Sequence, residues 1–332
     1  MNLIMRLNYF NMVPLISIII PCYNSERFIA ATINMLLRQD MSECELILVN
    51  DGSKDNTLSI LRQYETFHEN VRVIDQPNQG VSVARNVGML AAQGKYIYFL
   101  DSDDTLTEGT LNHFKQVVTE HSDCQILLFG YETRRNGRTC KSYVFPPFDR
   151  VTFSGYTLQR SFLSKKICCH ICSCIYDKAF ILEHGLALKP GLKIGEDILF
   201  LLQLMYKVSK VYYSARLSYI YQIRDDSAMQ GYKSYSITQY EPYTEWKRFL
   251  LPIAEQNHSI RNYVNFFLLF VYISSLRYYL RSDVKSKELN EYFIADGDIR
   301  YKKNFVGNIS YWIAMKVMMF VPIKLILKIL KS

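Results

Sequence analysis

The sequence contains no glycine-rich phosphate loop of the dinucleotide-binding or P-loop type, and it has no internal repeat or low-complexity segment. These absences exclude the commonest nucleotide-binding motifs and repeat architectures. Its eight cysteines lie mostly in apolar surroundings, and a chain of 332 residues does not need disulfides, so we interpret them as free thiols of a reducing cytoplasm. The composition, 49% hydrophobic and 21% charged, predicts about two folded domains, or one large domain with an appendage.

Acidic residues are missing from the end of the chain. Residues 300–332 include seven Lys or Arg and no Asp or Glu, whereas the rest of the chain has 32 basic and 31 acidic side chains. The net charge of +8 therefore belongs mainly to this tail. A nucleic-acid-binding protein usually carries a basic stripe on its folded body, so we expect no nucleic acid partner and favour contact with a membrane surface.

Short β-branched runs alternate with helical segments in the first half of the chain. We predict strands over 16–20, 45–49, 71–74, 96–100 and 125–129, and helices over 26–37, 55–64, 81–92 and 107–121. Ser25 is expected to cap the first of these helices. Further helices are predicted over 156–163 and 196–207, short strands over 211–213 and 219–223, and mostly helix from 234. The alternation predicts a mostly parallel sheet, whose ligand lies beyond the carboxyl ends of its strands.

The sharpest motif is Asp101-Ser102-Asp103, directly after a buried strand. Two carboxylates that flank one residue can hold a divalent cation such as Mg²⁺ or Mn²⁺, which can then bridge a diphosphate. Asp-rich turns also begin many helices, so the pattern alone is weak evidence. Its position at a strand end favours the metal site.

Three other segments carry candidate polar residues, each with a structural alternative. Asp51 could accept hydrogen bonds from a base or ribose, with Gly52 allowing close backbone approach, or the pair could form a turn and helix cap. Arg85 could neutralise phosphate or hold the carboxylates of the metal site, or lie on a solvated helix face. Glu196-Asp197 could supply a general base for an attacking hydroxyl, or simply cap the helix, because the helix dipole favours negative charge at its N-terminus.

In combination these segments resemble the family 2 glycosyltransferases, which have the GT-A fold. The matching stretches are ISIIIPCYN at 16–24, ILVNDGSKD at 47–55, NQGVSVARN at 78–86 and YIYFLDSDD at 96–104. Order and spacing agree over about residues 14–105, and the Glu196-Asp197 pair matches further on. We find no match after about residue 230.

The resemblance implies an α/β fold, a Rossmann-like GT-A sheet flanked by helices, with a helical C-terminal extension. It also implies inverting transfer of a sugar from a nucleoside diphosphate donor, usually a UDP-sugar, to a glycan or lipid-linked acceptor. The implied donor-binding residues are Pro21, Tyr23, Asn24, Glu26, Asp51, Gly52, Arg85, Asp101 and Ser102. Asp101 and Asp103 would bind Mn²⁺ or Mg²⁺, and Asp197 would be the catalytic base.

Two other enzyme or binding classes remain as alternatives. A sugar-1-phosphate nucleotidyltransferase also combines an α/β sheet with a metal, but it would need a glycine-rich loop after the first strand, where Pro21–Ser25 stands. A catalytically silent nucleotide-sugar-binding module is disfavoured by the intact Asp101, Asp103 and Asp197.

Two weaker patterns lie between residues 168 and 227. Cys168-Cys169-His170-Ile171-Cys172-Ser173-Cys174 includes a Cys-x-x-Cys pair, but no second ligand pair follows at zinc-site spacing, so packed thiols are favoured over zinc. Tyr221-Gln222-Ile223-Arg224, followed by Ser227, matches a family segment near the donor phosphates, or is simply a strand and a polar turn.

The last third divides into two predicted parts. We assign 1–12 as a non-native or disordered start, 13–230 as the glycosyltransferase domain, 231–300 as a helical extension and 301–332 as a basic amphipathic helix. The apolar stretch around 266–273 has only 15 uncharged residues between its flanking arginines, so a packed helix is favoured over a membrane span. Lysines on one face of 309–331 and Trp312 on the other suit an anionic membrane surface, although an oligomer contact or a docked helix would fit too. We therefore predict peripheral attachment to the cytoplasmic face of the membrane.

Overall fold

A computed structural model describes residues 13–224 and 235–301 of the chain, and these form two compact units. The first unit contains the described residues up to 155, together with 169–191 and 204–223. The second contains 156–168, 192–203 and the described residues from 224 onward. The predicted start at 1–12, Ser227 and the amphipathic helix at 309–331 lie outside the described residues.

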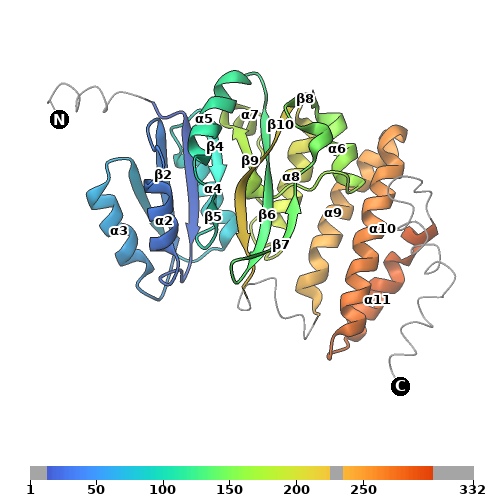
Figure 1. Cartoon of the computed structure of the whole chain (residues 1–332). Helices are drawn as coiled ribbons and strands as arrows, with labels where there is room; N and C mark the ends of the chain where they lie inside the picture. The colour runs from blue at the N-terminus through green and yellow to red at the C-terminus, as the bar shows by residue number, and fades with distance from the viewer. Residues whose placement is uncertain (1–12, 225–234, 302–332) are drawn as a thin grey trace. The chain divides into compact units, whose positions relative to one another are not determined.

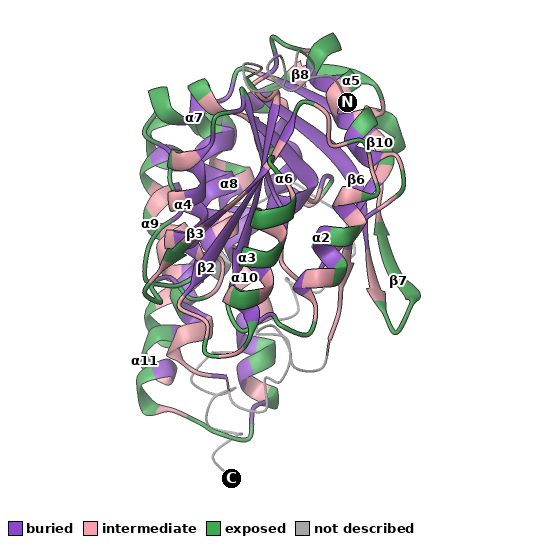
Figure 2. Ribbon diagram, turned by 90° about the vertical axis from the view of Figure 1, so that its left-hand side faces the viewer, coloured by how far each residue is buried: buried purple, intermediate pink, exposed green. Residues whose placement is uncertain are grey.

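The first unit is built on a ten-stranded sheet in the order β3-β2-β1-β4-β9-β6-β10-β5, with β7 beside β6 and β8 beside β10 (Figure 1). Its first four strands are β1 (Ile16–Cys22), β2 (Cys44–Asp51), β3 (Val71–Gln76) and β4 (Tyr96–Phe99). They pair in parallel, as predicted, and every residue of β1 and β4 is buried. Burial on both sides explains why these strands read as continuous apolar runs (Figure 2).

Antiparallel pairs enter the sheet beyond β4. The remaining strands are β5 (Thr105–Leu106), β6 (Ile126–Arg135), β7 (Arg138–Tyr143), β8 (Val151–Ser154), β9 (Cys174–Asp177) and β10 (Lys210–Gln222). β9 runs antiparallel to both β4 and β6, whereas β6 and β10 are parallel. The sheet is therefore parallel over its first four strands and mixed over the others.

One long strand replaces the two short strands predicted over 211–213 and 219–223. β10 continues through a bulge between Ser214 and Tyr219. Gly130 of β6 lies opposite, where an added Cβ would stand 2.7 Å from the carbonyl oxygen of Ala215. The polar residues of the bulge resemble those of a turn, which is why the sequence predicted two strands. The strand continues because Gly130 has no side chain that would collide with the bulge.

The helices of the first unit follow the predicted alternation. They are α2 (Ile29–Leu37), α3 (Thr57–Phe67), α4 (Val81–Ala91), α5 (Thr110–Glu120) and α7 (Lys178–Glu183), with short 3₁₀ turns at Pro146–Phe148 and Ile171–Ser173. The predicted cap at Ser25 is wrong, because α2 begins at Ile29 without a side-chain cap. Ser25 instead donates its backbone N–H to Thr57 Oγ1 at 2.8 Å.

The second unit is helical. It contains most of α6 (Gly155–Leu163), the first part of α8 (Glu196–Lys207), α9 (Ile237–Gln256), α10 (His258–Arg281), α11 (Lys287–Ala295) and a 3₁₀ turn at Asp296–Tyr301. Its core is rich in fully buried tyrosines, including Tyr240 and Tyr272. The hydroxyl of Tyr240 donates to Asp296 at 2.6 Å, and that of Tyr272 donates to the carbonyl of Phe293 at 2.8 Å. These bonds replace the hydrogen bonds to water that the hydroxyl groups lose on burial.

α10 has the length and apolar character of a membrane-crossing helix. It has 24 residues, and 56% of its most apolar window is buried inside the protein. Helices in the core of a soluble domain pass the same test, and α10 packs along α9. The packing agrees with the predicted core helix.

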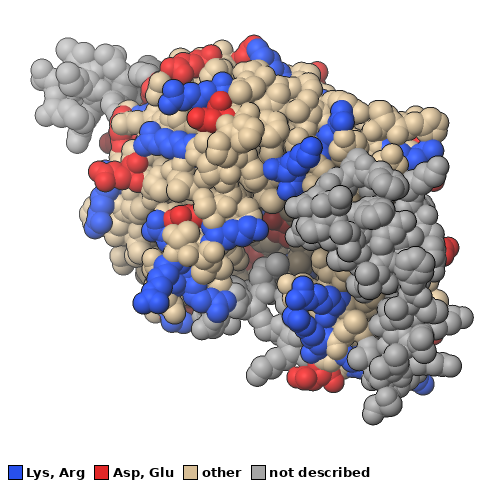
Figure 3. Space-filling model, turned by 45° about the vertical axis from the view of Figure 1, so that its right-hand side comes forward, with Lys and Arg blue, Asp and Glu red and all other residues tan. Residues whose placement is uncertain are grey.

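The charged side chains of the described body are mixed. On the face drawn in Figure 3, Lys and Arg lie among acidic and uncharged residues. The nearly balanced count of basic and acidic residues before position 300 agrees with this mixture.

Candidate active site

The carboxyl ends of the parallel strands bring together the donor-binding residues predicted in the first unit. Pro21 is buried within β1 and pairs with Val49, while Tyr23, just beyond the strand, is 51% exposed. Asp51 ends β2, and the Asp101 turn follows β4. Because β1, β2 and β4 are adjacent and parallel, the loops that follow them share one edge of the sheet.

Hydrogen bonds from side chains to backbone tie the loop after β1 to the loop after β2. Asn24, which has a left-handed backbone with φ of 50°, accepts the N–H of Lys54 on its Oδ1 at 2.8 Å. Glu26 accepts the N–H of Asn56 on Oε2 at 2.8 Å. In return, the backbone N–H of Asn24 donates to Ser53 Oγ at 3.1 Å. Asn24 and Glu26 thus shape the predicted nucleoside pocket through the backbone that they hold.

Asp51 connects the second loop to the third. Its Oδ1 accepts the backbone N–H of Gln79 at 2.9 Å, and its Oδ2 accepts that of Gly80 at 2.8 Å. Gly52, with φ of 68°, lies so close to the same loop that an added Cβ would stand 2.6 Å from the nitrogen of Asn78. The Asp51-Gly52 pair therefore fixes the entry to α4, and the close approach requires glycine.

Arg85 of α4 holds the first carboxylate of the metal motif. Its Nη2 donates to Asp101 Oδ1 at 2.7 Å, and the two side chains are 5% and 25% exposed. Burial alone would raise the pKa of Asp101, but the charge and hydrogen bond of Arg85 outweigh it and leave that pKa below its ordinary value. Asp101 is thus held ionised, while Ser102 and Asp103 are half-buried beside it.

Asp104 is a buried neighbour that the sequence analysis did not assign to the site. It accepts a hydrogen bond from the Tyr219 hydroxyl on Oδ2 and from the backbone N–H of Gln222 on Oδ1, the latter at 2.8 Å. Burial, together with the charges of Asp101 and Asp103, raises the pKa of Asp104 well above its ordinary value. The end of β10 therefore closes on the aspartate turn, and Gln222, in the segment that resembles the family's segment near the donor phosphates, lies beside it.

His170 is a second residue of this site that sequence reasoning missed. The Tyr98 hydroxyl, on the strand that ends at the aspartate turn, donates to the carbonyl of Cys172 at 2.6 Å and so anchors the His170 segment there. The His170 ring stacks on Tyr219 with centroids 5.1 Å apart, and its charge helps to lower the pKa of Asp101. The segment was noted only as a weak zinc pattern, a Cys-x-x-Cys pair with His170 nearby, and Cys172 of that pair is fully buried.

Asn86, the residue after Arg85, binds the backbone of Leu188 in the same unit. Asn86 donates from Nδ2 to the carbonyl of Leu188 at 2.8 Å and accepts the N–H of Leu188 on Oδ1 at 2.9 Å. One turn of α4 thus holds both the Asp101 carboxylate and a chain segment 102 residues away.

The predicted base, Asp197, belongs to the second unit, in the first turn of α8. Gly195, which precedes it with φ of 74°, lies against α9: an added Cβ would stand 2.6 Å from Trp246 Cζ2 and 2.9 Å from Pro242 Cβ. Trp246 Nε1 also donates to the Gly195 carbonyl at 3.1 Å. The start of α8 is therefore positioned by α9, while Asp197 itself is half-buried and accepts the N–H of Ile198 at 2.7 Å.

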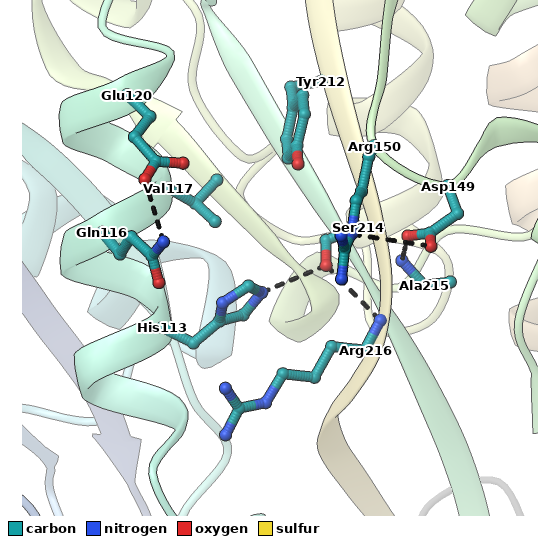
Figure 4. A pocket seen from close by; sticks show the side chains of 10 residues that line it. All are labelled: His113, Gln116, Val117, Glu120, Asp149, Arg150, Tyr212, Ser214, Ala215 and Arg216. Atoms are coloured by element: carbon teal, nitrogen blue, oxygen red, sulfur yellow. Dashed lines mark hydrogen bonds and ion pairs between the residues drawn. The ribbon is translucent and has the colours of Figure 1, made fainter.

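A separate pocket of about 680 Å³ lies between α5 and β10 in the first unit. Figure 4 shows its lining, which includes His113, Arg150 and Arg216 and none of the predicted site residues. His113 Nε2 lies 3.1 Å from Ser214 Oγ. Burial and the charge of Arg216 lower the pKa of His113, so its neutral form is favoured.

The family model described as glycosyl transferase family 2 matches residues 17–184, which is about half of the chain. The chain belongs to glycosyltransferase family 2. Its match ends before Gly195, so the turn that carries Asp197 and the helices of the extension lie beyond it.

Curated family 2 relatives cover parts of the chain. It is 40% identical over 138 residues to the uncharacterized glycosyltransferase EpsJ of Bacillus subtilis, which is 42% of this chain and 39% of EpsJ. It is 36% identical over 139 residues to the putative teichuronic acid biosynthesis glycosyltransferase TuaG of the same organism, covering 41% of this chain and 55% of TuaG. The chain thus spans about half the length of these relatives or less.

The fold of the family 2 chain is also found in solved structures. The crystal structure of S. aureus TarS 1–349 in complex with UDP aligns with a TM-score of 0.64 and 24% identity. The alignment covers 86% of this chain and 80% of TarS 1–349. It confirms the GT-A class of fold, including a helical C-terminal region.

Members of family 2 generally use a divalent metal ion. Within residues 13–224 and 235–301, no three His, Cys, Asp or Glu side chains are grouped as a ready-made metal site. Asp101 and Asp103 could supply two carboxylates, with Asp101 held ionised by Arg85. This donor set fits an ion that binds one or two carboxylates and completes its shell with substrate phosphates and water, as Mg²⁺ commonly does.

Proposed function

We propose that this chain is an inverting glycosyltransferase that moves a sugar from a UDP-sugar to a hydroxyl of a glycan or lipid-linked acceptor in cell-surface polysaccharide synthesis. The observation that carries the proposal is the Asp101 turn at the carboxyl edge of the parallel strands, with Arg85 bonded to Asp101 at 2.7 Å. An ionised aspartate held at this edge suits a metal–diphosphate. The fold shared with TarS, solved with UDP, supports the donor class, and the match to TuaG supports the product class.

Two groups of residues would bind the donor. Pro21, Tyr23 and the loops held by Asn24, Glu26 and Asp51 would line the nucleoside pocket, with Gly52 allowing close approach. At the diphosphate, Asp101 and Asp103 would bind Mn²⁺ or Mg²⁺, next to Ser102. When bound there, such an ion would supply positive charge that stabilises the departing diphosphate. Arg85 keeps Asp101 ionised and oriented for that role.

Asp197 would act as the base of the transfer step. The acceptor oxygen forms a bond to the anomeric carbon while the bond from that carbon to the diphosphate oxygen breaks. The hydroxyl proton passes to the Asp197 carboxylate, and the nucleoside diphosphate leaves. Attack on the side opposite to the leaving group inverts the anomeric configuration. Trp246 and Pro242 support this role by fixing the turn that precedes Asp197.

The proposed place of action is the cytoplasmic face of the cell membrane, with the basic segment after residue 301 in contact with lipid. This proposal is supported by the composition of residues 300–332, which include seven basic residues and no acidic residue. A chain that ends at residue 301 should partition into vesicles of phosphatidylglycerol less than the full chain does. Equal partitioning would show that the tail is not the anchor.

The enzymatic proposal is tested by a screen of UDP- and GDP-sugars. We expect a UDP-sugar to raise the melting temperature of the full chain, and to be hydrolysed slowly, only when Mn²⁺ or Mg²⁺ is present. Asp103→Ala should remove both effects, while Asp123→Ala, a carboxylate that is 64% exposed, should retain them. A full response in the presence of a chelator would refute the metal-dependent assignment.

A further inference from the structure

The pocket between α5 and β10 has no role in the proposed transfer reaction. Its volume of about 680 Å³ is within the range of pockets that hold small ligands. Its walls come from α5, from the turn before β8 and from the middle of β10, all in the first unit (Figure 4). Packing of a helix on a sheet can also leave such a hollow, so the volume alone does not identify a binding site.

The strand that forms one wall of the pocket is irregular at this point. The register of β10 against β6 shifts after Ser214, and neither Ala215 nor Arg216 is paired with a residue of β6. Asp149 Oδ1 accepts the backbone N–H of Ala215 at 2.7 Å, so the bulge is held in place. Arg216 thereby comes close enough to His113 for its charge to lower the pKa of that ring. Bulges that re-aim a side chain in this way are frequent next to active sites.

Arg150 has a strained backbone at the pocket. Its φ of 55° lies in the left-handed region, which bulky residues rarely adopt and which glycine adopts without strain. Its N–H donates to the carbonyl of Tyr213 at 2.9 Å, and Val151 pairs with Tyr213, so the strand pair fixes this conformation. Its Nε lies 4.0 Å from Asp149 Oδ2, which is too far for a hydrogen bond. Strain of this kind is concentrated at active sites and ligand clamps.

Tyr212 places a hydroxyl group in the pocket. Its ring stacks on that of His121 with centroids 3.7 Å apart, and the residue is only 6% exposed. Within the described ranges 13–224 and 235–301, its hydroxyl has no hydrogen-bond partner, whereas buried tyrosines usually have one. Figure 4 shows this hydroxyl directed into the pocket. Burial and the charge of Asp149 raise the pKa of Tyr212, so the hydroxyl keeps its proton and can donate it to a ligand.

The charges that line the pocket are balanced. Two guanidinium groups, of Arg150 and Arg216, face two carboxylates, of Glu120 and Asp149. Among the described residues, the one ion pair between these four groups is the 4.0 Å contact of Arg150 with Asp149. The lowered pKa of His113 keeps its ring uncharged at neutral pH. Donors and acceptors therefore stand side by side without an excess of either charge.

This lining matches a sugar better than an anion. A phosphate or carboxylate ligand needs donors and positive charge, and the two carboxylates would repel it. Each hydroxyl of a sugar both donates and accepts a hydrogen bond, so a ring with several hydroxyls can use guanidinium, carboxylate and tyrosine groups together.

The pocket and the aspartate turn lie along the same strand. Gln222 of β10, whose backbone N–H is bonded to Asp104, follows Ser214 by eight residues. A strand of that length spans at most about 26 Å. An extended glycan can therefore contact both places.

We propose that the pocket between α5 and β10 binds uncharged sugar units of a glycan, at a distance from the site where the sugar is transferred. Arg150, Arg216 and the Tyr212 hydroxyl donate to the sugar, and the carboxylates of Glu120 and Asp149 accept from it. This inference rests on the proposed function and deepens it, because it gives the transferase a second contact with its glycan. Contact at two points on one chain favours long acceptors over short ones.

The test measures binding of the full chain to immobilised oligosaccharides. The neutral ones are oligomers of glucose, galactose, mannose and N-acetylglucosamine, and the acidic ones are oligomers of glucuronate and galacturonate. UDP and Mg²⁺ are present so that the donor pocket is filled. Arg150→Gly removes a guanidinium and also relieves the strained backbone, so the fold should be retained. Glu43→Gly is the matched control, since Glu43 has φ of 60° and lies outside the pocket.

We expect the unaltered chain and Glu43→Gly to bind at least one neutral oligosaccharide equally well. Arg150→Gly should bind it at least about tenfold more weakly, because a hydrogen bond from a charged group is lost. Its melting temperature should be equal or higher, which a merely structural arginine would not allow. Tyr212→Phe should weaken binding about threefold to tenfold. Tyr206→Phe, which removes a hydroxyl outside the pocket, should leave binding unchanged.

Three results would overturn the proposal: no neutral oligosaccharide bound, acidic oligosaccharides bound alone, or equal binding by Arg150→Gly and the unaltered chain. None of these measurements needs sugar transfer. Loss of binding in Arg150→Gly together with a failed UDP-sugar screen would contradict the proposed function and support the pocket. A successful screen without pocket-dependent binding would do the reverse.

Discussion

The two units hold their candidate catalytic groups by different means. In the first, carboxylates and amides such as Asp51 and Asn24 bind backbone N–H groups of neighbouring loops. In the second, the turn before Asp197 is fixed by an aromatic ring against a glycine, with Trp246 over Gly195. The first arrangement joins residues 28 to 30 positions apart within the family match, whereas the second joins residues 51 positions apart and depends on a helix outside that match. Under the proposed roles, the helical extension positions the turn that carries the base.

The largest expected effect is at the proposed metal site of the first unit. Asp103→Ala should lower kcat by at least about 1000-fold, because the charge that stabilises the departing diphosphate is lost. The rate of sugar transfer from the donor found in the screen measures this. Asp123→Ala is the control, and an unaffected rate in Asp103→Ala would refute the metal assignment.

The corresponding change in the second unit is Asp197→Asn. We expect kcat to fall at least about 100-fold, since an amide cannot take the acceptor proton. The affinity for donor, measured by calorimetry, should stay within about twofold, because the proposed donor residues belong to the other unit. Loss of donor affinity with normal turnover of bound donor would contradict this division of roles.

The polar network of the first unit is broken by Asp51→Asn. Asparagine has one acceptor oxygen in place of two, so one of the backbone N–H groups of Gln79 and Gly80 loses its partner. We expect a loss of about 1–3 kcal/mol in the free energy of unfolding and about tenfold weaker donor binding. Denaturant unfolding and donor calorimetry measure the two effects. Asp75→Asn, in the neighbouring strand, is the control, and normal donor binding by Asp51→Asn would contradict the network's role.

The aromatic support of the second unit is weakened by Trp246→Phe. An aromatic ring is retained, but the hydrogen bond to the Gly195 carbonyl and the contact of Cζ2 with Gly195 are both lost. We expect kcat to fall about threefold to tenfold with donor affinity unchanged. Tyr292→Phe, which removes a polar group from α11, is the control. A change confined to the donor KM would contradict a positioning role for Trp246.

The smallest effect concerns an ion pair of the first unit, Asp40 with Lys115, at 2.6 Å. The hydrogen bond from Lys115 lowers the pKa of Asp40 to about 2. Because this carboxyl is acidic in the folded state, its contribution is present above about pH 4 and disappears as the pH falls through about 2. Asp40 is 49% exposed, so Asp40→Asn should cost at most about 1 kcal/mol at pH 7. Unfolding curves at pH 7 and pH 2.5 measure the difference, and an equal loss at both would contradict the assignment.

The sequence predicted the first half of the chain well, because strand and helix periodicity there is strong and the strands are buried on both sides. It also offered three roles for Arg85, and the structure shows the side chain buried and bonded to the Asp101 carboxylate. A sequence motif does not show which group each side chain will bind. Asn24 and Glu26 were expected at the donor, and they bind backbone groups of the next loop.

Long-range pairing explains what the sequence could not predict. His170 lies beside the aspartate turn because β9 inserts antiparallel between β4 and β6. No local sequence pattern predicts that insertion. Asp104 differs from its neighbours because it is buried and bonded to Tyr219 and to the backbone of Gln222, both more than 100 residues later. Gly195 looked like an ordinary residue before a helix, and its requirement for glycine arises from Trp246, 51 residues later.

The bond between Tyr219 and Asp104 joins residues 115 positions apart, and this has a consequence for synthesis on the ribosome. Strands β1 to β4 emerge first and can pair with one another, but the Asp104 carboxyl cannot be covered until β10 has left the exit tunnel. At the elongation rates of cells, about 5–20 residues per second, that delay is on the order of ten seconds. During this interval the nascent chain has a sheet with an open edge at β4, so the strands of the later half determine when the aspartate turn becomes a finished site.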